Sequence, residues 1–285
     1  MTKMKASELR EITQLLPLPN WVMQQITKHK PLVYPDEPVI VSGKGNFAVF
    51  EIRDAQEFIQ HYIYFRGFYE FRETRLIKQH LRPGDVFIDV GANIGWFTLL
   101  AANIVGESGK VIAFEPSFEN YEHLKKNVDI NPFTNINLEK IALSNQNGTV
   151  VLRKISSKNK GLDSIIESGK ELGVVKTEKV TTIKLDDYLD NNKIKQIKFI
   201  KIDVEGAEMM VLQGMNKILK NKICDYLMLE VCNDRLQKIG SSSKDVISFL
   251  KGYGYCLFHV NTFGNRLIKD EDEVLSANIF AVANY

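Results

Sequence analysis

Residues 86–95 read VFIDVGANIG, and residues 111–116 read VIAFEP. The first stretch is an apolar run that ends in an acid and continues into a turn of small residues. In α/β proteins this pattern brings backbone amides close to a ligand at the carboxyl end of a strand. Glu115 ends the second run, and the spacing of about 20 residues matches one helical crossover. The two stretches predict a doubly wound sheet with a nucleoside-cofactor site, in which Glu115 holds a ribose.

The spacing within the turn favours S-adenosylmethionine over a dinucleotide. Turns that bind NAD run G-x-G-x-x-G, because the pyrophosphate sits on the N-terminus of the helix. Here the order is Gly91-x-Asn93-x-Gly95 with Asp89 just before it, as in Class I methyltransferases. Asparagine tolerates a positive φ, and an aspartate suits an ammonium or sulfonium better than a pyrophosphate. A nicotinamide-dependent oxidoreductase is the rival interpretation, but it needs a pyrophosphate turn that this sequence lacks.

Composition narrows the class of protein. The chain has 285 residues, enough for one substantial core with a smaller appended region. Its 37 lysines and arginines nearly balance 35 acids, so nothing in the charge calls for nucleic acid. The three cysteines form no C-x-x-C pair. The N-terminus lacks the apolar segment of a signal peptide, and the longest apolar stretch, 96–105, is too short for a membrane span. We therefore expect a cytoplasmic protein.

Hydrophobic periodicity divides the chain into two parts. From residue 86 onward, short apolar strands alternate with amphipathic helices, which predicts a mostly parallel sheet with helices on both faces. We expect a Class I methyltransferase (Rossmann-like) α/β domain over 81–285, with an inserted antiparallel pair around 148–185. The parallel strands are expected at 86–90, 111–114, 136–142, 199–202 and 226–231, and a closing antiparallel pair at 255–260 and 279–283.

Residues 1–80 are expected to form a small cap on the substrate side. Two proline clusters precede a hairpin turn that we expect at Gly43-Lys44-Gly45. Residues 58–71 are dense in aromatic side chains, most of which we assign to packing, although some could stack on a substrate.

Residues 199–208, FIKIDVEGAE, form the second cluster of interest. They end the fourth predicted strand, which flanks the topological switch point together with the first. Asp203 and Glu205 should therefore face the same crevice as Gly91 and Asn93. Glu208 is expected in the first helical turn, where an acid complements the helix dipole. Lys201 receives no role from the pattern.

Several stretches, in order, resemble signatures of FkbM-type S-adenosylmethionine-dependent methyltransferases. They are DVGANIG at 89–95, AFEP at 113–116, ALS at 142–144, LDD at 185–187 and KIDVEGAE at 201–208, with YE at 69–70 upstream. The resemblance covers roughly residues 69–255 and implies transfer of a methyl group to a hydroxyl of a sugar, glycan or natural product. The expected cofactor-binding residues are Glu70, Asp89, Gly91, Ala92, Asn93, Gly95, Glu115, Pro116, Ala142, Leu143 and Asp203.

Methyl transfer to a hydroxyl also needs a group that takes the proton. Asp203 is the leading candidate if its neighbours Glu205 and Glu230 raise its pKa, with Glu230 included in the catalytic set. His259 is the alternative, because histidine titrates near neutrality. The same acids, Asp203, Glu205 and Glu230, could instead supply oxygen ligands to Mg²⁺, which would make a divalent-metal-assisted O-methyltransferase.

Two further rivals come from other classes. Nucleic-acid amino-methyltransferases carry an Asn/Asp-Pro-Pro-aromatic motif after the fourth strand, whereas Asn131-Pro132-Phe133 follows the second helix and is simply a helix stop. We therefore expect a small-molecule or glycan acceptor and no nucleic acid. A binding module that lost catalysis is disfavoured by the intact Asp89, Glu115 and Asp203.

Overall fold

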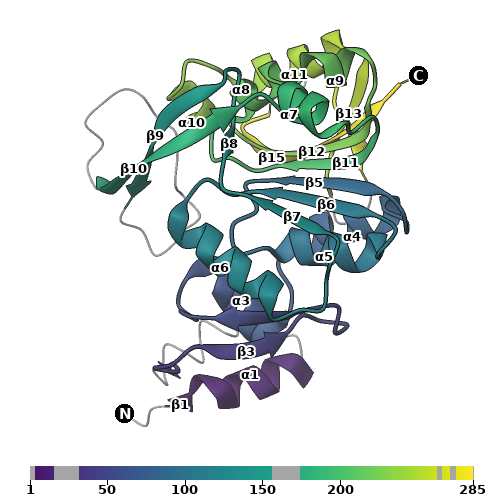
Figure 1. The fold of residues 1–285 in the computed structure, drawn as a ribbon. Helices are drawn as coiled ribbons and strands as arrows, with labels where there is room; N and C mark the ends of the chain where they lie inside the picture. Colours follow the sequence, from purple (N-terminus) through teal and green to yellow (C-terminus); the bar gives the residue numbers. More distant parts are fainter. Residues whose placement is uncertain (1–3, 16–31, 156–173, 262–264, 270–273, 285) are drawn as a thin grey trace.

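The computed structural model describes residues 4–15, 32–155, 174–261, 265–269 and 274–284. Within these residues an eight-stranded sheet with the order β14-β13-β15-β12-β11-β5-β6-β7 forms the centre of the molecule (Figure 1). Its strands are β5 (Val86–Val90), β6 (Lys110–Phe114), β7 (Ile136–Glu139), β11 (Ile197–Ile202), β12 (Cys224–Cys232), β13 (Tyr255–His259), β14 (Arg266–Leu267) and β15 (Ser276–Ala283).

The strand directions confirm the predicted fold class. Strands β7, β6, β5, β11 and β12 pair in parallel, and β15 runs antiparallel between β12 and β13. Parallel neighbouring strands are joined by long crossover connections, usually helices. Strands β5 and β11 therefore lie side by side although more than a hundred residues separate them in the chain. The order reverses between β5 and β11, so this is the topological switch point where α/β sheets bind ligands.

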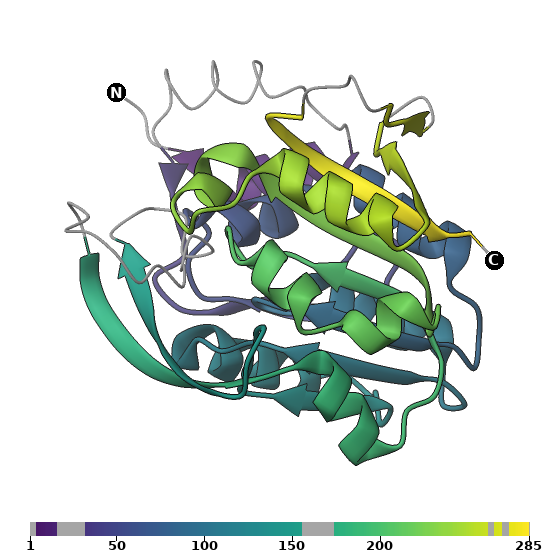
Figure 2. The ribbon, with the colours of Figure 1, turned by 90° about the horizontal axis from the view of Figure 1, so that it is seen from above.

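Helices cover both faces of the sheet, as Figures 1 and 2 show. Ile88 and Phe87 are adjacent on β5 and point to opposite faces, so each enters a different buried cluster. The cluster of Ile88 includes residues of α7, α8, α9, α10 and α11, and the cluster of Phe87 includes residues of α4 and α5. These helices are α4 (Phe71–His80), α5 (Trp96–Val105), α6 (Phe118–Asp129), α7 (Leu185–Asn192), α8 (Glu208–Gln213), α9 (Asn216–Lys220), α10 (Asn233–Gln237) and α11 (Ser243–Gly252).

The N-terminal elements pack on the face that carries α5. They are β1 (Met4–Lys5), α1 (Ala6–Leu15), β2 (Leu32–Val33), β3 (Val39–Ser42), β4 (Val49–Ile52) and α3 (Phe58–Arg66). Strands β3 and β4 form the hairpin predicted around Gly43-Lys44-Gly45. Asn127 of α6 accepts from Glu51 N and donates to Ile94 O, both at 2.8 Å, which ties this hairpin to the turn after β5.

The third predicted parallel strand, 136–142, is shorter than expected. Strand β7 ends at Glu139, and β8 (Ala142–Leu143) leaves the central sheet to pair with β10 (Val174–Ile183). Strand β10 also pairs antiparallel with β9 (Gly148–Ile155), and these two long strands project from the body in both ribbon views. A small buried cluster that includes Ala142 and Leu152 supports this second sheet. In the described part of the chain, no helix has the length and apolarity to cross a membrane.

Candidate active site

A cavity of about 710 Å³ lies at the carboxyl ends of β5, β6, β11 and β12. Its walls come from the turn after β5, the residues that follow β6 and β11, the end of β12, and the segment that joins α3 to α4. Ligand pockets of proteins commonly measure about 300–1,000 Å³, so this volume suits a nucleoside cofactor together with part of an acceptor.

The turn after β5 has the backbone shape that its sequence predicts. Gly91, Asn93 and Gly95 all have positive φ, of 80°, 51° and 93°. A Cβ on Gly91 would lie 1.9 Å from the carbonyl oxygen of Asp203, so only glycine lets this turn pass against the end of β11. Gly91, Ala92 and Asn93 line the cavity.

Gly95 does not line the cavity, and its contact with the cofactor stays a prediction. It starts α5, and a Cβ there would lie 2.5 Å from Leu124 Cδ1 of α6. Its small size therefore serves the close packing of α5 against α6.

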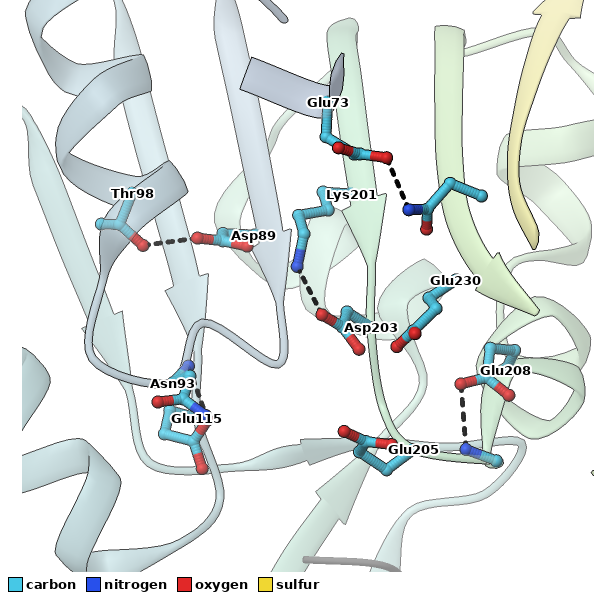
Figure 3. Close-up of polar contacts among 12 residues, drawn as sticks. Glu73, Asp89, Asn93, Thr98, Glu115, Lys201, Asp203, Glu205, Glu208 and Glu230 are labelled. Carbon is cyan, nitrogen blue, oxygen red and sulfur yellow. Dashed lines mark hydrogen bonds and ion pairs between the residues drawn. The ribbon is translucent and has the colours of Figure 1, made fainter. Parts of the chain in front are cut away.

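Glu115 ties the end of β6 to the turn after β5. Its Oε2 accepts from Asn93 N and its Oε1 from Ser117 N, each at 2.9 Å, while the residue is 5% exposed (Figure 3). Glu115 and Pro116 line the cavity, and Ala142 and Leu143 line it as well. The structure thus brings these four sequence-predicted residues to one cavity.

Asp89 lies beneath the turn and not in the cavity. It is 1% exposed, accepts a hydrogen bond of 2.6 Å from Thr98 Oγ1, and is absent from the residues that line the cavity (Figure 3). Burial raises its pKa, against the nearby charge of Lys201. Asp89 thus lies outside the lining of this cavity, and its contact with the cofactor stays a prediction.

Lys201 lines the cavity, although the sequence analysis gave it no role. Its Nζ lies 2.9 Å from Asp203 Oδ2 and 4.7 Å from the ring centroid of Phe97, and only 7% of its side chain is exposed (Figure 3). Side chains two residues apart on a strand share a face, so the alternation rule alone places Lys201 beside Asp203. The available signal was the position of this lysine, two residues before Asp203, near the end of a strand whose other residues are apolar except Lys198.

Lys201 also shifts the pKa of Asp203 in the direction opposite to the one predicted. Burial raises the pKa of Asp203, but the charge and hydrogen bond of Lys201 outweigh burial and hold it below its usual range. Asp203 is therefore ionised at neutral pH. The expectation that neighbouring acids would make it a strong base is wrong, because the nearest charge is positive.

The raised pKa belongs to the two other acids. Burial, then the charge of Asp203, raises the pKa of Glu230 to about 7 and that of Glu205 to about 9. Glu230 also shares a hydrogen bond with Asp203. Arg235 contacts Glu205, and its Nη1 lies 3.4 Å from Glu230 Oε2. Glu230 therefore gains or loses its proton near neutral pH, whereas the neighbouring Asp203 stays ionised.

Three carboxylates here have the spacing of a cation site. Oxygens of Asp203, Glu205 and Glu230 lie within 4.8 Å of one another. Lys201 and Arg235 already contact these acids, so two positive charges compensate most of the negative charge. These two cations partly offset the repulsion among the acids, and the carboxylate oxygens would suit Mg²⁺.

The segment between α3 and α4 contributes an acid and several rings. Glu70 starts α4 with a φ of 41° and lines the cavity. Burial raises its pKa to about 8, while Lys201 opposes the shift. Tyr64 and Phe65 are buried packing residues, as expected for most of this stretch. Five other aromatic residues line the cavity, more than the sequence led us to expect: Phe58, Tyr62, Phe68, Tyr69 and Phe71.

His259 is not placed to act as the base. It lies on β13, which β15 and β12 separate from β11. Three strand spacings amount to about 14 Å, and His259 is not among the residues that line the cavity. The structure therefore does not bring His259 together with Asp203.

The chain matches known proteins over most of its length. A model of the methyltransferase FkbM domain matches residues 89–257. The hexuronic acid methyltransferase AglP of Haloferax volcanii is 27% identical over 238 residues, which cover 84% of this chain and 88% of that protein. The 31-O-demethyl-FK506 methyltransferase FkbM of Streptomyces tacrolimicus is 24% identical, covering 61% of this chain and 74% of that protein. The structure of a putative rRNA-methylase from Clostridium thermocellum aligns with a TM-score of 0.45 at 15% identity, over 74% of this chain and 93% of that one.

Proposed function

This chain belongs to the methyltransferase FkbM domain family, and on that premise we propose that it transfers the methyl group of S-adenosylmethionine to a hydroxyl of a sugar, glycan or related small molecule. The chain is a methyltransferase, and the turn after β5 together with Glu115 supports S-adenosylmethionine as its methyl donor. One observation carries the finer proposal. A single cavity joins the turn after β5 and Glu115 to Glu230, whose pKa is about 7, and to an aromatic wall.

The residues of the cavity fit the cofactor. S-adenosylmethionine, when bound, supplies a methyl group activated by a sulfonium charge. Gly91 and Asn93 give the close backbone approach for the methionine part, and Glu115 presents its carboxylate toward a ribose. Ala142 and Leu143 offer an apolar surface to the adenine. Glu70, at the wall of the same cavity, is an acid toward which the ammonium of the cofactor can point.

We assign the general base to Glu230 and not to Asp203. A base is most effective when its pKa lies near the working pH, because it is then both ionised and able to hold a proton. Glu230 meets this condition, whereas Lys201 keeps Asp203 ionised with a lowered pKa. Glu230 takes the proton of the acceptor hydroxyl, and the hydrogen bond to Asp203 stabilises the protonated form.

The acceptor side of the cavity supports a sugar-like molecule. The aromatic side chains of Phe58 and Tyr62 and two guanidinium groups line the same cavity; the guanidinium groups are those of Arg72 and Arg235. Rings next to fixed polar groups orient a ligand that has apolar faces and hydroxyl edges. The relative AglP is named for a hexuronic acid, which has this character and a carboxylate.

A divalent-metal-assisted O-methyltransferase is the second candidate, favoured by the spacing of Asp203, Glu205 and Glu230. A bound Mg²⁺ would lower the pKa of an acceptor hydroxyl, so that its proton could pass to water without Glu230 as the base. Methyl transfer measured with EDTA and with added Mg²⁺ separates the two candidates. We expect equal rates, and a strict requirement for metal would favour the second candidate.

The first experiment measures cofactor binding. Calorimetric titration with S-adenosylmethionine, S-adenosylhomocysteine and NAD should give binding of the first two only, and Glu115→Ala should abolish this binding.

Transfer of a labelled methyl group to glucuronic acid, glucose and other hydroxylated sugars then tests the acceptor class. Glu230→Gln should lower kcat by about 10²–10⁴-fold and leave the affinity for S-adenosylhomocysteine nearly unchanged. Binding of NAD alone, or full activity of Glu230→Gln, would contradict the proposal.

A further inference from the structure

The start of α4 places Glu70 at the wall of the cavity, and the backbone there needs support. Glu70 has a φ of 41°, a conformation that is uncommon for residues other than glycine. Its own side chain makes no capping hydrogen bond to the helix. Backbone in such a conformation persists when the contacts around it hold it in place. The first residues of α4 provide these contacts.

Glu73 ties the first turn of α4 to the central sheet. Asn278 Nδ2 of β15 donates to Glu73 Oε1 at 2.6 Å, and Glu73 is only 6% exposed (Figure 3). The two residues are 205 positions apart in the chain, so the contact exists only in the folded protein. Removing one partner strands the other where water reaches it only partly, which costs free energy.

Asn278 is also a neighbour of the general base, Glu230. The two residues pair across β15 and β12. Residues directly opposite each other in an antiparallel pair point to the same face, with Cβ atoms about 4.5–5.5 Å apart. The hydrogen bond from Asn278 to Glu73 therefore fastens α4 to the pair of strands that carries Glu230.

Thr74 fastens the same turn to the cofactor side of the cavity. Its Oγ1 donates to Tyr69 O at 3.0 Å and accepts from Trp96 Nε1 at 2.9 Å. Trp96 is 3% exposed and begins α5, directly after the turn that follows β5. The start of α4 is thus held at two points, by the strand opposite Glu230 and by the helix after the cofactor turn.

Glu73 and Asn278 lie behind the cavity wall. Neither of them lines the cavity, whereas Glu70 does. Burial is the main cause of the raised pKa of Glu70, and the charge of Glu73 adds to it, so these two side chains lie near each other. Like charges repel, and the hydrogen bond from Asn278 keeps the carboxylate of Glu73 directed toward β15. Glu70 is then the acid of α4 that reaches the cavity.

We propose that Glu73 and Asn278 are positioning residues, whose hydrogen bond holds the first turn of α4 so that Glu70 receives the ammonium of S-adenosylmethionine. This inference rests on the proposed function, because it takes the cavity as the cofactor site. Loss of the hydrogen bond should affect the part of the cofactor that Glu70 binds and spare the adenosine.

Calorimetric titration with two ligands tests the proposal. S-adenosylhomocysteine carries the ammonium, whereas methylthioadenosine has the same adenosine and sulfur but lacks the amino-acid part. Glu73→Ala and Asn278→Ala should each weaken binding of S-adenosylhomocysteine about tenfold or more and leave that of methylthioadenosine nearly unchanged. Glu73→Gln keeps an oxygen that accepts from Asn278, so it should retain the affinity of the unaltered protein. The double alanine variant should bind no more weakly than either single variant, because both substitutions remove the same hydrogen bond.

Asn135→Ala is the matched control. The side chain of Asn135 also ties two distant segments, because its Nδ2 donates to Gly106 O at 2.7 Å at the end of α5, but Asn135 does not line the cavity. Urea unfolding should show a loss of stability in this variant too, while both ligands bind as before.

Several outcomes would overturn the proposal. Equal weakening of both ligands in Glu73→Ala and Asn278→Ala would indicate a general loss of structure, and unchanged affinity for S-adenosylhomocysteine would show that Glu70 does not depend on the hydrogen bond. A Glu73→Gln variant as weak as Glu73→Ala, or additive effects in the double variant, would also exclude it. Failure of the proposed function would look different, because S-adenosylhomocysteine would then not bind the unaltered protein.

Discussion

Replacement of Lys201 by methionine should destabilise the protein strongly and in a pH-dependent way. The substitution keeps most of the buried volume and removes one charge, which lies 2.9 Å from Asp203 Oδ2. At an effective dielectric constant of about 20, two unit charges at that distance attract by about 6 kcal/mol. Part of this is offset by the cost of burying the ammonium, so we expect a loss of about 3–5 kcal/mol in the free energy of unfolding near pH 8.

The direction of the pH dependence follows from the pKa of Asp203. With Lys201 present, the pKa of Asp203 is below its usual range. The ionised Asp203 therefore contributes its full stabilisation above the unfolded pKa of about 3.9. Without Lys201, burial dominates and raises the pKa of Asp203 above the unfolded value. Stability is then present at acid pH and is lost as pH rises through the new folded pKa. Lys201 itself has a raised pKa and stays charged at neutral pH. The defect of the variant should therefore be smaller at about pH 5.5 than at about pH 8.5.

Urea unfolding followed by circular dichroism, at both pH values, measures this difference. Lys198→Met is the matched control, because Lys198 lies on the same strand, 2.8 Å from Asp225 Oδ2 and 5.1 Å from the ring centroid of Tyr226. Its side chain is 30% exposed, against 7% for Lys201. An exposed pair contributes about 0–1 kcal/mol. Similar losses in both variants, or a loss in Lys201→Met that does not grow with pH, would refute the reasoning.

Three other predictions follow from the site and its supports. The kcat of methyl transfer should rise with pH and level off above the pKa of Glu230, about 7 in the free protein, since the base must lose its proton; a flat pH profile would remove Glu230 as the base. Gly91→Ala should weaken binding of S-adenosylhomocysteine at least about tenfold and lower the free energy of unfolding by about 1–3 kcal/mol, because the new Cβ would meet Asp203 O. The control is Gly45→Ala, which should not affect binding, because Gly45 has a similar φ with open space around it. Asn127→Ala should lower the free energy of unfolding by about 1–3 kcal/mol for each backbone group left without a hydrogen bond, because the buried Asn127 side chain bonds to Glu51 N and Ile94 O. Urea unfolding measures the loss, and a loss no larger than that of the exposed control Asn137→Ala would contradict this role.

Local sequence signals were sufficient for the fold and for part of the site. The turn at Gly91 and Asn93 needs positive φ, which only a few residue types adopt easily. The residue types at these positions therefore predict the backbone conformation of the turn. Two-residue alternation and apolar runs located the strands of the central sheet, because those patterns depend on neighbours in the chain. The end of β7 was misjudged, since Ala142 and Leu143 pair with β10, a strand more than thirty residues away.

The chemistry of the site depended on distances that the sequence does not contain. Asp203 and Glu205 were correctly expected at the switch point, because the order of strands brings the ends of β5 and β11 together. Their protonation was not predictable, since a pKa follows from burial and from charges that approach through space. Lys201 lowers the pKa of Asp203, and burial beside Asp203 raises that of Glu230 to about 7.

The sequence by itself determined that this chain forms a doubly wound methyltransferase fold with a cofactor turn after β5 and an acid at the end of β6. Only the tertiary structure decided that Asp89 lies under that turn, that His259 lies away from the cavity, and that the ammonium of Lys201 contacts Asp203. The physical reason is the range of the forces involved. Backbone conformation and amphipathic pattern are local properties, whereas desolvation and Coulomb interactions depend on which distant segments the fold brings together.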